Sequence, residues 1–209
     1  MDVTESTRQK DKKLGHRRVK DGEVTYKTVQ TTQLMSSIQL GLRESLADTA
    51  NKEEMDLVRA DFDRVDTMEF KNNENFPPFK VGHISMICTT LILMFQFLTF
   101  APTCFKKFRT VFGIDHHHFL ESLCDQPMIE LSNPGASGSI FYVTQDDEVI
   151  CKTVSRSEAR FLQDILSEYY LNLHQNNRTL LTKFFGFFCY SSRYRKVIFS
   201  LSGHQKLQV

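Results

Sequence analysis

The chain has 209 residues, a hydrophobic fraction of 41% and an aromatic fraction of 11%, which suit one or two domains with a packed core. Its formal net charge is +1 at pH 7, so no bulk electrostatic field points to nucleic acid as a partner. The five cysteines form no CxxC pair, and no signal peptide is apparent at the start. We therefore expect reduced thiols in an intracellular protein.

Residues 1–25 are polar and charged, and we interpret them as a disordered basic tail. The stretch from Lys10 to Lys20 holds most of the basic side chains. It is either a solvated tail or a segment attracted to anionic lipid. Residues 26–209 then form the folded part of the chain.

The first periodic segments predict a helix and then a strand. Leu34, Ile38, Leu42 and Leu46 recur at near-helical spacing. The following stretch "ADFDRVDTMEF" alternates well enough for a strand, with Phe62, Val65, Met68 and Phe70 as its apolar residues.

A run without any charged residue extends from Val81 to Phe105. Read as a helix, Val81 to Pro102 would just span a hydrocarbon core of about 30 Å at about 1.5 Å per residue. His83, Thr89, Thr90 and Gln96 dilute this run, so an apolar insertion remains open as the other interpretation.

Two helices are expected next. "TCFKKFRTVFG" predicts a helix that ends at Gly113, and Asp115 can cap a second helix, "HHHFLESL". The three histidines at 116–118 suggest a metal site, but neighbouring helix positions point about 100° apart. We interpret them as an ordinary helix start and predict no metal ligands.

A glycine loop follows the short strand "PMIEL". In "LSNPGASGSIFYVTQDDEVICKTV", small residues at 135–139 precede two strands, and Lys152 lies on the second strand. A loop without bulky side chains lets backbone N–H groups approach phosphates, and a lysine on the next strand can neutralise their charge. A plain hairpin whose lysine extends to solvent would look similar.

The next segment predicts a helix over 157–175. Ser155 and Glu158 have capping-box spacing, and an apolar face comprises Leu162, Ile165, Leu166, Tyr169 and Leu173. Glu158 is a candidate partner for Lys152, but its capping role already explains its position, and we favour that interpretation. Strands are then expected in "TLLTKFFGFFCY" and from Val197 to Leu201.

Several motifs together resemble the amino-terminal lobe of a phosphatidylinositol phosphate kinase of the type I branch. They are the loop "GASGS", the strand "ICKTV", the segment "NNRTLLTKFFGFFC", and upstream "LGHRRVKDGEVTYK" and "SSIQLGL". The resemblance covers most of residues 13–190. It implies that residues 26–209 are a partial domain of this family, with 81–96 as an apolar insertion. It implies an α+β fold, with an antiparallel sheet and packed helices, from which the carboxy-terminal lobe is missing.

By this resemblance, Gly135, Ala136, Ser137, Gly138, Ser139 and Lys152 would bind ATP. The reaction implied is transfer of the γ-phosphoryl group, with Mg²⁺, onto phosphatidylinositol 4-phosphate to give phosphatidylinositol 4,5-bisphosphate. Phosphoinositide lipids at the inner face of the plasma membrane would be the partners of a cytoplasmic, peripheral protein. A homodimer through the amino-terminal lobe is a further expectation.

The chain also departs from the family pattern. Arg160 replaces a second glutamate of the helix, Thr182 replaces a proline, and the likeness fades after Cys189. The family's catalytic aspartate and metal-binding aspartate have no counterpart here, so we expect the chain alone to be inactive. The alternatives are a catalytically dead lobe that binds an intact kinase, and a membrane-anchored fragment.

Comparison with the family pattern also accounts for the apolar run. When residues 81–96 are removed, Phe79-Lys80 joins Phe97-Leu98-Thr99-Phe100-Ala101-Pro102, and the family register returns. A valine codon begins with GT and a glutamine codon can end in AG. We therefore favour a retained intron at 81–96 over a genuine insertion or a membrane span.

Overall fold

The computed structural model describes residues 26–50, 56–70, 80–81, 84–85, 94–131, 138–176 and 179–204. Side chains are described for these residues except 26–33, 50, 80–81 and 84–85. The predicted tail at 1–25 therefore lies outside the described residues, and so do Gly135, Ala136 and Ser137 of the glycine loop.

Seven strands form one antiparallel sheet, in which the order of the strands differs from their order along the chain. The elements in chain order are α1 Tyr26–Ala50, α2 Arg59–Asp63, β1 Val65–Phe70, β2 Lys80–Val81, β3 Ile84–Ser85, β4 Phe95–Phe100, α3 Pro102–Val111, α4 His116–Cys124, β5 Ile129–Leu131, β6 Phe141–Val143, β7 Val149–Val154, α5 Arg156–Asp164, α6 Leu166–Gln175, β8 Phe184–Ser192 and β9 Lys196–Gly203. The sheet order is β1-β4-β8-β9-β7-β6-β5, and β2 pairs with β3 separately. This arrangement confirms the predicted α+β class.

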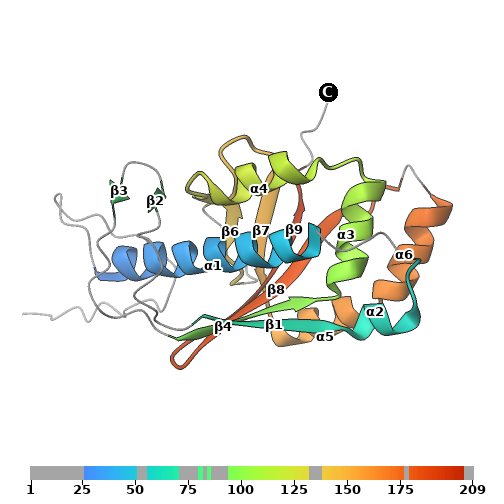
Figure 1. Cartoon of the computed structure of the whole chain (residues 1–209), viewed down its shortest axis with the longest axis horizontal. Coiled ribbons are helices and arrows are strands. Elements are labelled where there is room, and N and C mark those ends of the chain that lie inside the picture. The colour runs from blue at the N-terminus through green and yellow to red at the C-terminus, as the bar shows by residue number, and fades with distance from the viewer. Residues whose placement is uncertain are drawn as a thin grey trace, which may run out of the picture.

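Helices cover both faces of this sheet. On one face, α1 and α4 pack against aromatic side chains of the central strands, among them Phe97, Phe188 and Phe199. On the other face, α3, α5 and α6 share a second core with Phe187. Figure 1 shows α1 running along the sheet beside α4, with α2, α3 and α6 gathered at one end of the molecule. Alternating residues of β8 thus serve two separate cores.

The predicted apolar stripe of α1 faces the sheet. Ile38, Leu42 and Leu46 are all buried, and the Gln39 side chain among them donates hydrogen bonds to the backbone oxygens of Leu123 and Gln126. Close packing explains Gly41, because a Cβ atom there would lie 2.2 Å from the Phe97 ring. The helix therefore approaches β4 at a position that only glycine permits.

The predicted boundaries of α3 and α4 are confirmed. Pro102 occupies the first turn of α3, and the helix ends before Gly113, whose φ is +70°. Asp115 Oδ1 accepts the backbone N–H of His118 at 2.8 Å and caps α4. The predicted strand over 60–70 is wrong in its first half, where α2 forms because Asp61 accepts the Val58 N–H and supports a helical turn.

The predicted helix over 157–175 is two helices that meet at Ile165. The dihedrals of Ile165 are φ −93° and ψ 0°, yet its N–H still bonds to Phe161 O and its carbonyl still accepts from Tyr169. Leu162, Leu166 and Tyr169 are buried as predicted, whereas Ile165 is only half-buried. The predicted apolar face is therefore buried at Leu162, Leu166, Tyr169 and Leu173 but only in part at Ile165.

The charge-free run ends in a core strand. Phe95 and Gln96, the last residues of the predicted insertion, lie in β4 opposite Phe70 and Glu69, and the Phe95 ring stacks on Phe70 at 4.5 Å. Interpreting 81–102 as one membrane-spanning helix is therefore wrong. Among the described residues, no helix has the length and apolarity needed to cross a bilayer.

Candidate functional site

The glycine loop connects β5 to β6 at one end of the sheet. Of its five predicted residues, only Gly138 and Ser139 are described. Gly138 has φ +66°, a conformation that disfavours other residues, and no described heavy atom lies within 4 Å of a Cβ atom placed there. The Ile140 N–H bonds to Thr153 Oγ1 at 2.8 Å and fixes the end of the loop to β7.

Lys152 lies on β7, directly between Phe141 of β6 and Ser200 of β9. Its Nζ atom is 5.9 Å from the centre of the Phe141 ring, within range of a cation–π contact. The side chain is 32% exposed. The ammonium thus lies over an aromatic ring and is still accessible to a ligand.

Glu158 on α5 bonds to both Lys152 and the helix start. Its Oε1 lies 3.1 Å from Lys152 Nζ, while its Oε2 accepts the Ser155 N–H at 2.7 Å. Ser155 Oγ in turn accepts the Glu158 N–H at 3.3 Å, which completes the capping box. The capping role and the lysine contact are therefore not alternatives, and the preference for capping alone is wrong.

These contacts keep the Glu158 carboxyl ionised. Hydrogen bonds from the backbone and side chain of Ser155, followed by the one from Lys152, lower the pKa of Glu158 to about 2. The carboxylate is consequently negative at neutral pH and holds the lysine ammonium in place. Arg160, which replaces a family glutamate, is exposed and does not deprive Lys152 of a carboxylate partner.

Sequence reasoning did not identify Phe141 as part of the site. Its pairing with Lys152 depends on the register of the β6–β7 hairpin. The acidic turn "TQDDE" could have indicated this pairing. A hydrogen bond from the Thr144 N–H to the Val149 carbonyl closes the turn, and the pairing of β6 with β7 follows outward from that bond.

The arrangement can bind and orient an anionic group. It combines a positive-φ glycine that has no described heavy atom near its Cβ position, a partly exposed ammonium and a carboxylate that positions this ammonium. Such a set neutralises phosphate charge but contains no group placed to activate a hydroxyl nucleophile. The four described cysteines, Cys104, Cys124, Cys151 and Cys189, are free and buried, and burial raises the pKa of Cys151 to about 12.

Comparisons with known proteins point the same way. Residues 122–204 match the family model described as phosphatidylinositol-4-phosphate 5-kinase, so the likeness does not end near Cys189 as expected but includes β9. The match thus contains the glycine loop, Lys152, Glu158 and the strands that position them.

Individual relatives align over a longer part of the chain. The chain is 49% identical to phosphatidylinositol 4-phosphate 5-kinase type-1 sktl of Drosophila melanogaster over 181 residues, which are 86% of the chain and 22% of the relative. It is 46% identical to the type-1 alpha enzyme of Rattus norvegicus over 85% of the chain and 31% of the relative. With the type-1 beta enzyme of Homo sapiens, identity is 44% over 81% of the chain and 30% of the relative.

The chain therefore spans less than a third of the length of these relatives. Within the matched span the identity is 44–49%. The comparisons confirm that, over most of its residues, this chain resembles the type I phosphatidylinositol 4-phosphate 5-kinases.

Proposed function

We propose that this chain is the ATP-orienting, amino-terminal part of a type I phosphatidylinositol phosphate kinase. The reaction would transfer the γ-phosphoryl group of ATP to phosphatidylinositol 4-phosphate and give phosphatidylinositol 4,5-bisphosphate. The observation that carries the proposal is the ion pair between Lys152 and Glu158 beside the glycine loop. The identity to enzymes named as 5-kinases supports the choice of substrate.

The described residues fit ATP phosphates. Gly138 leaves room for a phosphate to approach the backbone, since no described atom occupies the position of a side chain there. In the proposed role, residues 135–139 cover the phosphates and Lys152 Nζ bonds to their oxygens. Glu158 keeps the ammonium aimed at that position while it also fixes the start of α5.

The site near Lys152 is not suited to hold Mg²⁺ by itself. Glu158 is the carboxylate beside the lysine, and both of its oxygens accept hydrogen bonds. Mg²⁺, when bound with ATP, would neutralise charge that develops during transfer. We therefore assign its ligands to residues outside this chain, as the family resemblance implies.

Residues 1–209 alone should not phosphorylate the lipid. Phosphoryl transfer depends on metal-centred charge neutralisation and alignment of the nucleophile, and the chain offers no aspartate motif for either task. Joining residues 1–204, without 81–96, to the carboxy-terminal lobe of a type-1 relative should restore activity. Residue 204 is the junction because a fusion after Cys189 would cut β8 and discard β9.

The assay uses labelled ATP, Mg²⁺ and vesicles that contain phosphatidylinositol 4-phosphate. We expect turnover by the chimera and none by residues 1–209. A folded chimera without activity would contradict the proposal. If the chimera is inactive but residues 1–209 bind an intact type-1 kinase, the interaction-partner function replaces the proposed kinase function. Turnover by residues 1–209 alone would show that a second lobe is not needed.

A further inference from the structure

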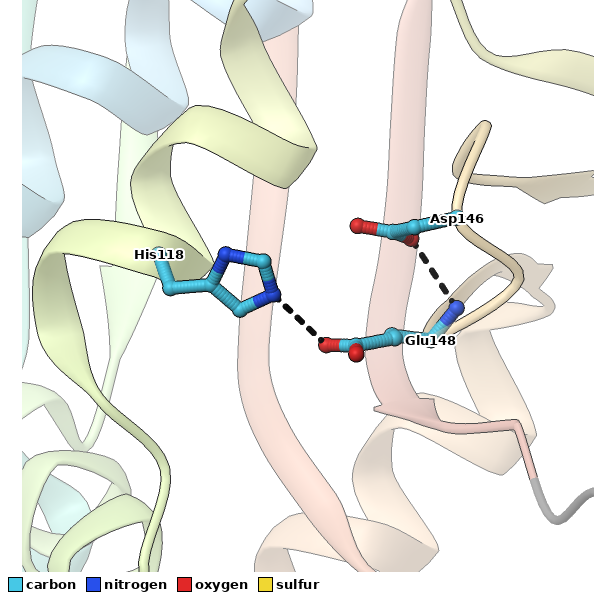
Figure 2. Close-up of side chains that lie close together, drawn as sticks. All are labelled: His118, Asp146 and Glu148. Carbon is cyan, nitrogen blue, oxygen red and sulfur yellow. Dashed lines mark hydrogen bonds and ion pairs between the residues drawn. The ribbon is translucent and has the colours of Figure 1, made fainter.

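Three side chains with metal-binding atoms meet between α4 and the β6–β7 turn, away from Lys152. His118 comes from the first turn of α4, and Asp146 and Glu148 come from the turn. His118 Nε2 lies 3.2 Å from Glu148 Oε2, and the ligating atoms of all three residues lie within 4.8 Å of one another. Figure 2 shows the imidazole pointing at the two carboxylates across the gap.

The backbone that carries His118 is fixed. Asp115 Oδ1 caps the helix by accepting the His118 N–H at 2.8 Å. The next residue, Phe119, is buried and packs edge-to-face on Phe185 of β8. Because the cap and the core contact hold the first turn of α4, the fold rather than the cluster fixes the position of the His118 backbone.

The acidic turn is held equally firmly. Asp146 Oδ1 accepts hydrogen bonds from Thr144 Oγ1 at 2.5 Å and from the Glu148 N–H at 3.0 Å. The His204 N–H, just after β9, donates to the Glu148 carbonyl at 2.9 Å. Asp147 between them adopts φ +61° and so allows the tight turn. Contacts other than those with His118 thus hold the Asp146 carboxylate and the Glu148 backbone, and the Glu148 carboxylate itself bonds to His118 Nε2.

We propose that His118, Asp146 and Glu148 bind a divalent transition-metal ion, with Zn²⁺ the ion of choice. One imidazole nitrogen and two carboxylate oxygens are ligands that Zn²⁺ accepts, and water would complete the shell. Tetrahedral bonds of about 2.0–2.2 Å place ligand atoms roughly 3.4 Å apart, close to the 3.2 Å between His118 and Glu148. The remaining separation closes by small rotations of exposed side chains.

Charge also favours a divalent cation. Two carboxylates and a neutral imidazole balance the charge of the ion.

Such an ion would brace the hairpin that bears the nucleotide-site residues. The turn connects β6 and β7, which carry Phe141 and Lys152. The α4 helix is anchored in the core on the sheet face opposite to these two side chains. The site is distinct from that of a nucleotide-bound Mg²⁺, because Mg²⁺ prefers an octahedral oxygen shell and binds imidazole poorly. This inference does not depend on the proposed kinase function.

The test is calorimetric titration of the chelator-treated 209-residue chain with Zn²⁺ at neutral pH. We expect one saturable site, and Mg²⁺ in excess should not compete for it. His118→Ala and Glu148→Gln should each weaken binding by at least about tenfold. His117→Ala is the matched control, since His117 is an exposed neighbour outside the cluster, and it should bind Zn²⁺ as the unchanged chain does.

Circular dichroism checks that each variant is folded. Zn²⁺ should raise the thermal midpoint of the unchanged chain and of His117→Ala, but not that of His118→Ala or Glu148→Gln. Absence of saturable binding by the unchanged chain would overturn the proposal. Equal affinity in His118→Ala, or an equal loss in His117→Ala and His118→Ala, would overturn it too, because the ion would then be bound elsewhere.

Discussion

The centre of the seven-stranded sheet and its β5 edge are packed very differently. The central strand β8 is buried over most of its length and β9 over residues 199–202, and the rings of Phe188 and Phe199 stack 5.6 Å apart on the face that α1 covers. At the β5 edge, every residue of β5 is exposed, and the neighbouring β6 and β7 carry the half-exposed Phe141 and Lys152. The aromatic centre supplies stability, and the sparsely covered edge leaves the lysine accessible.

The sharpest test of this contrast is to replace one side chain in the central strands and one in the edge strand by alanine. Phe199 is fully buried and contacts both Phe97 and Phe188, so Phe199→Ala should lower the free energy of unfolding by about 3–5 kcal/mol. Leu131→Ala in β5 should change it by less than about 1 kcal/mol, because Leu131 is 37% exposed. Urea unfolding measures both, and equal losses would show that the centre and the edge are packed alike.

The contact between α1 and β4 allows a second test. Gly41→Ala places a methyl group 2.2 Å from the Phe97 ring. Overpacking of this kind costs about 1–3 kcal/mol, which exceeds the gain in helix propensity of about 1 kcal/mol. In a double-mutant cycle, Phe97→Leu should reduce the cost of Gly41→Ala. A stabilising Gly41→Ala would mean that α1 lies farther from the sheet.

A smaller effect is expected at Glu158. The pKa of Glu158, about 2, lies below its ordinary value of 4.5, so its ionised form stabilises the fold above pH 4.5. That contribution is lost as the pH falls toward 2. Glu158→Ala should therefore cost about 1 kcal/mol at pH 7 and less at pH 3. Glu158→Gln, which can keep the capping bonds, should cost less than Glu158→Ala at pH 7.

Urea unfolding at the two pH values measures these differences. A cost of Glu158→Ala that grows as the pH falls would contradict the assignment of the low pKa. Equal costs for the glutamine and alanine variants would instead assign the whole contribution to the Lys152 contact.

The smallest change in stability is expected from removing residues 81–96. We propose that this segment is dispensable for the sheet, because its removal brings Phe79 and Lys80 into the β4 positions of Phe95 and Gln96. There they would face Phe70 and Glu69, where Gln96 now bonds to Glu69, and Lys80 would replace that hydrogen bond by an ion pair. The shortened chain should unfold cooperatively at a similar midpoint, whereas loss of folding would show that the segment is integral.

Features close in sequence were the ones that could be predicted. The stripe of α1, the caps at Asp115 and Ser155, and the loop–strand–lysine–helix order follow from spacing alone. The Lys152–Glu158 contact spans six positions and was at least a candidate. By contrast, the insertion of β8 and β9 between β4 and β7 depends on long-range pairing that no local pattern encodes.

Other features were missed for the same reason. His118 and Glu148 are 30 positions apart, so their contact cannot be read from the histidine run. Arg109 is buried and donates to the Phe185 carbonyl at 2.6 Å, and burial lowers its pKa to about 10. Its position in a helix rich in lysines gave no sign that it faces the core.

Replacement of one lysine tests the central claim most directly. In the chimera, Lys152→Met should lower kcat/KM for ATP by about 10²–10³, the loss typical of removing one preorganised charge-stabilising donor, without unfolding the protein. Lys183→Met is the matched control, because Lys183 also lies over an aromatic ring, 5.3 Å from the centre of Phe112, and its loss should leave kcat/KM within about twofold of the unchanged chimera. Unchanged activity in a folded Lys152→Met variant, or an equal loss in both variants, would contradict the claim that Lys152 orients ATP.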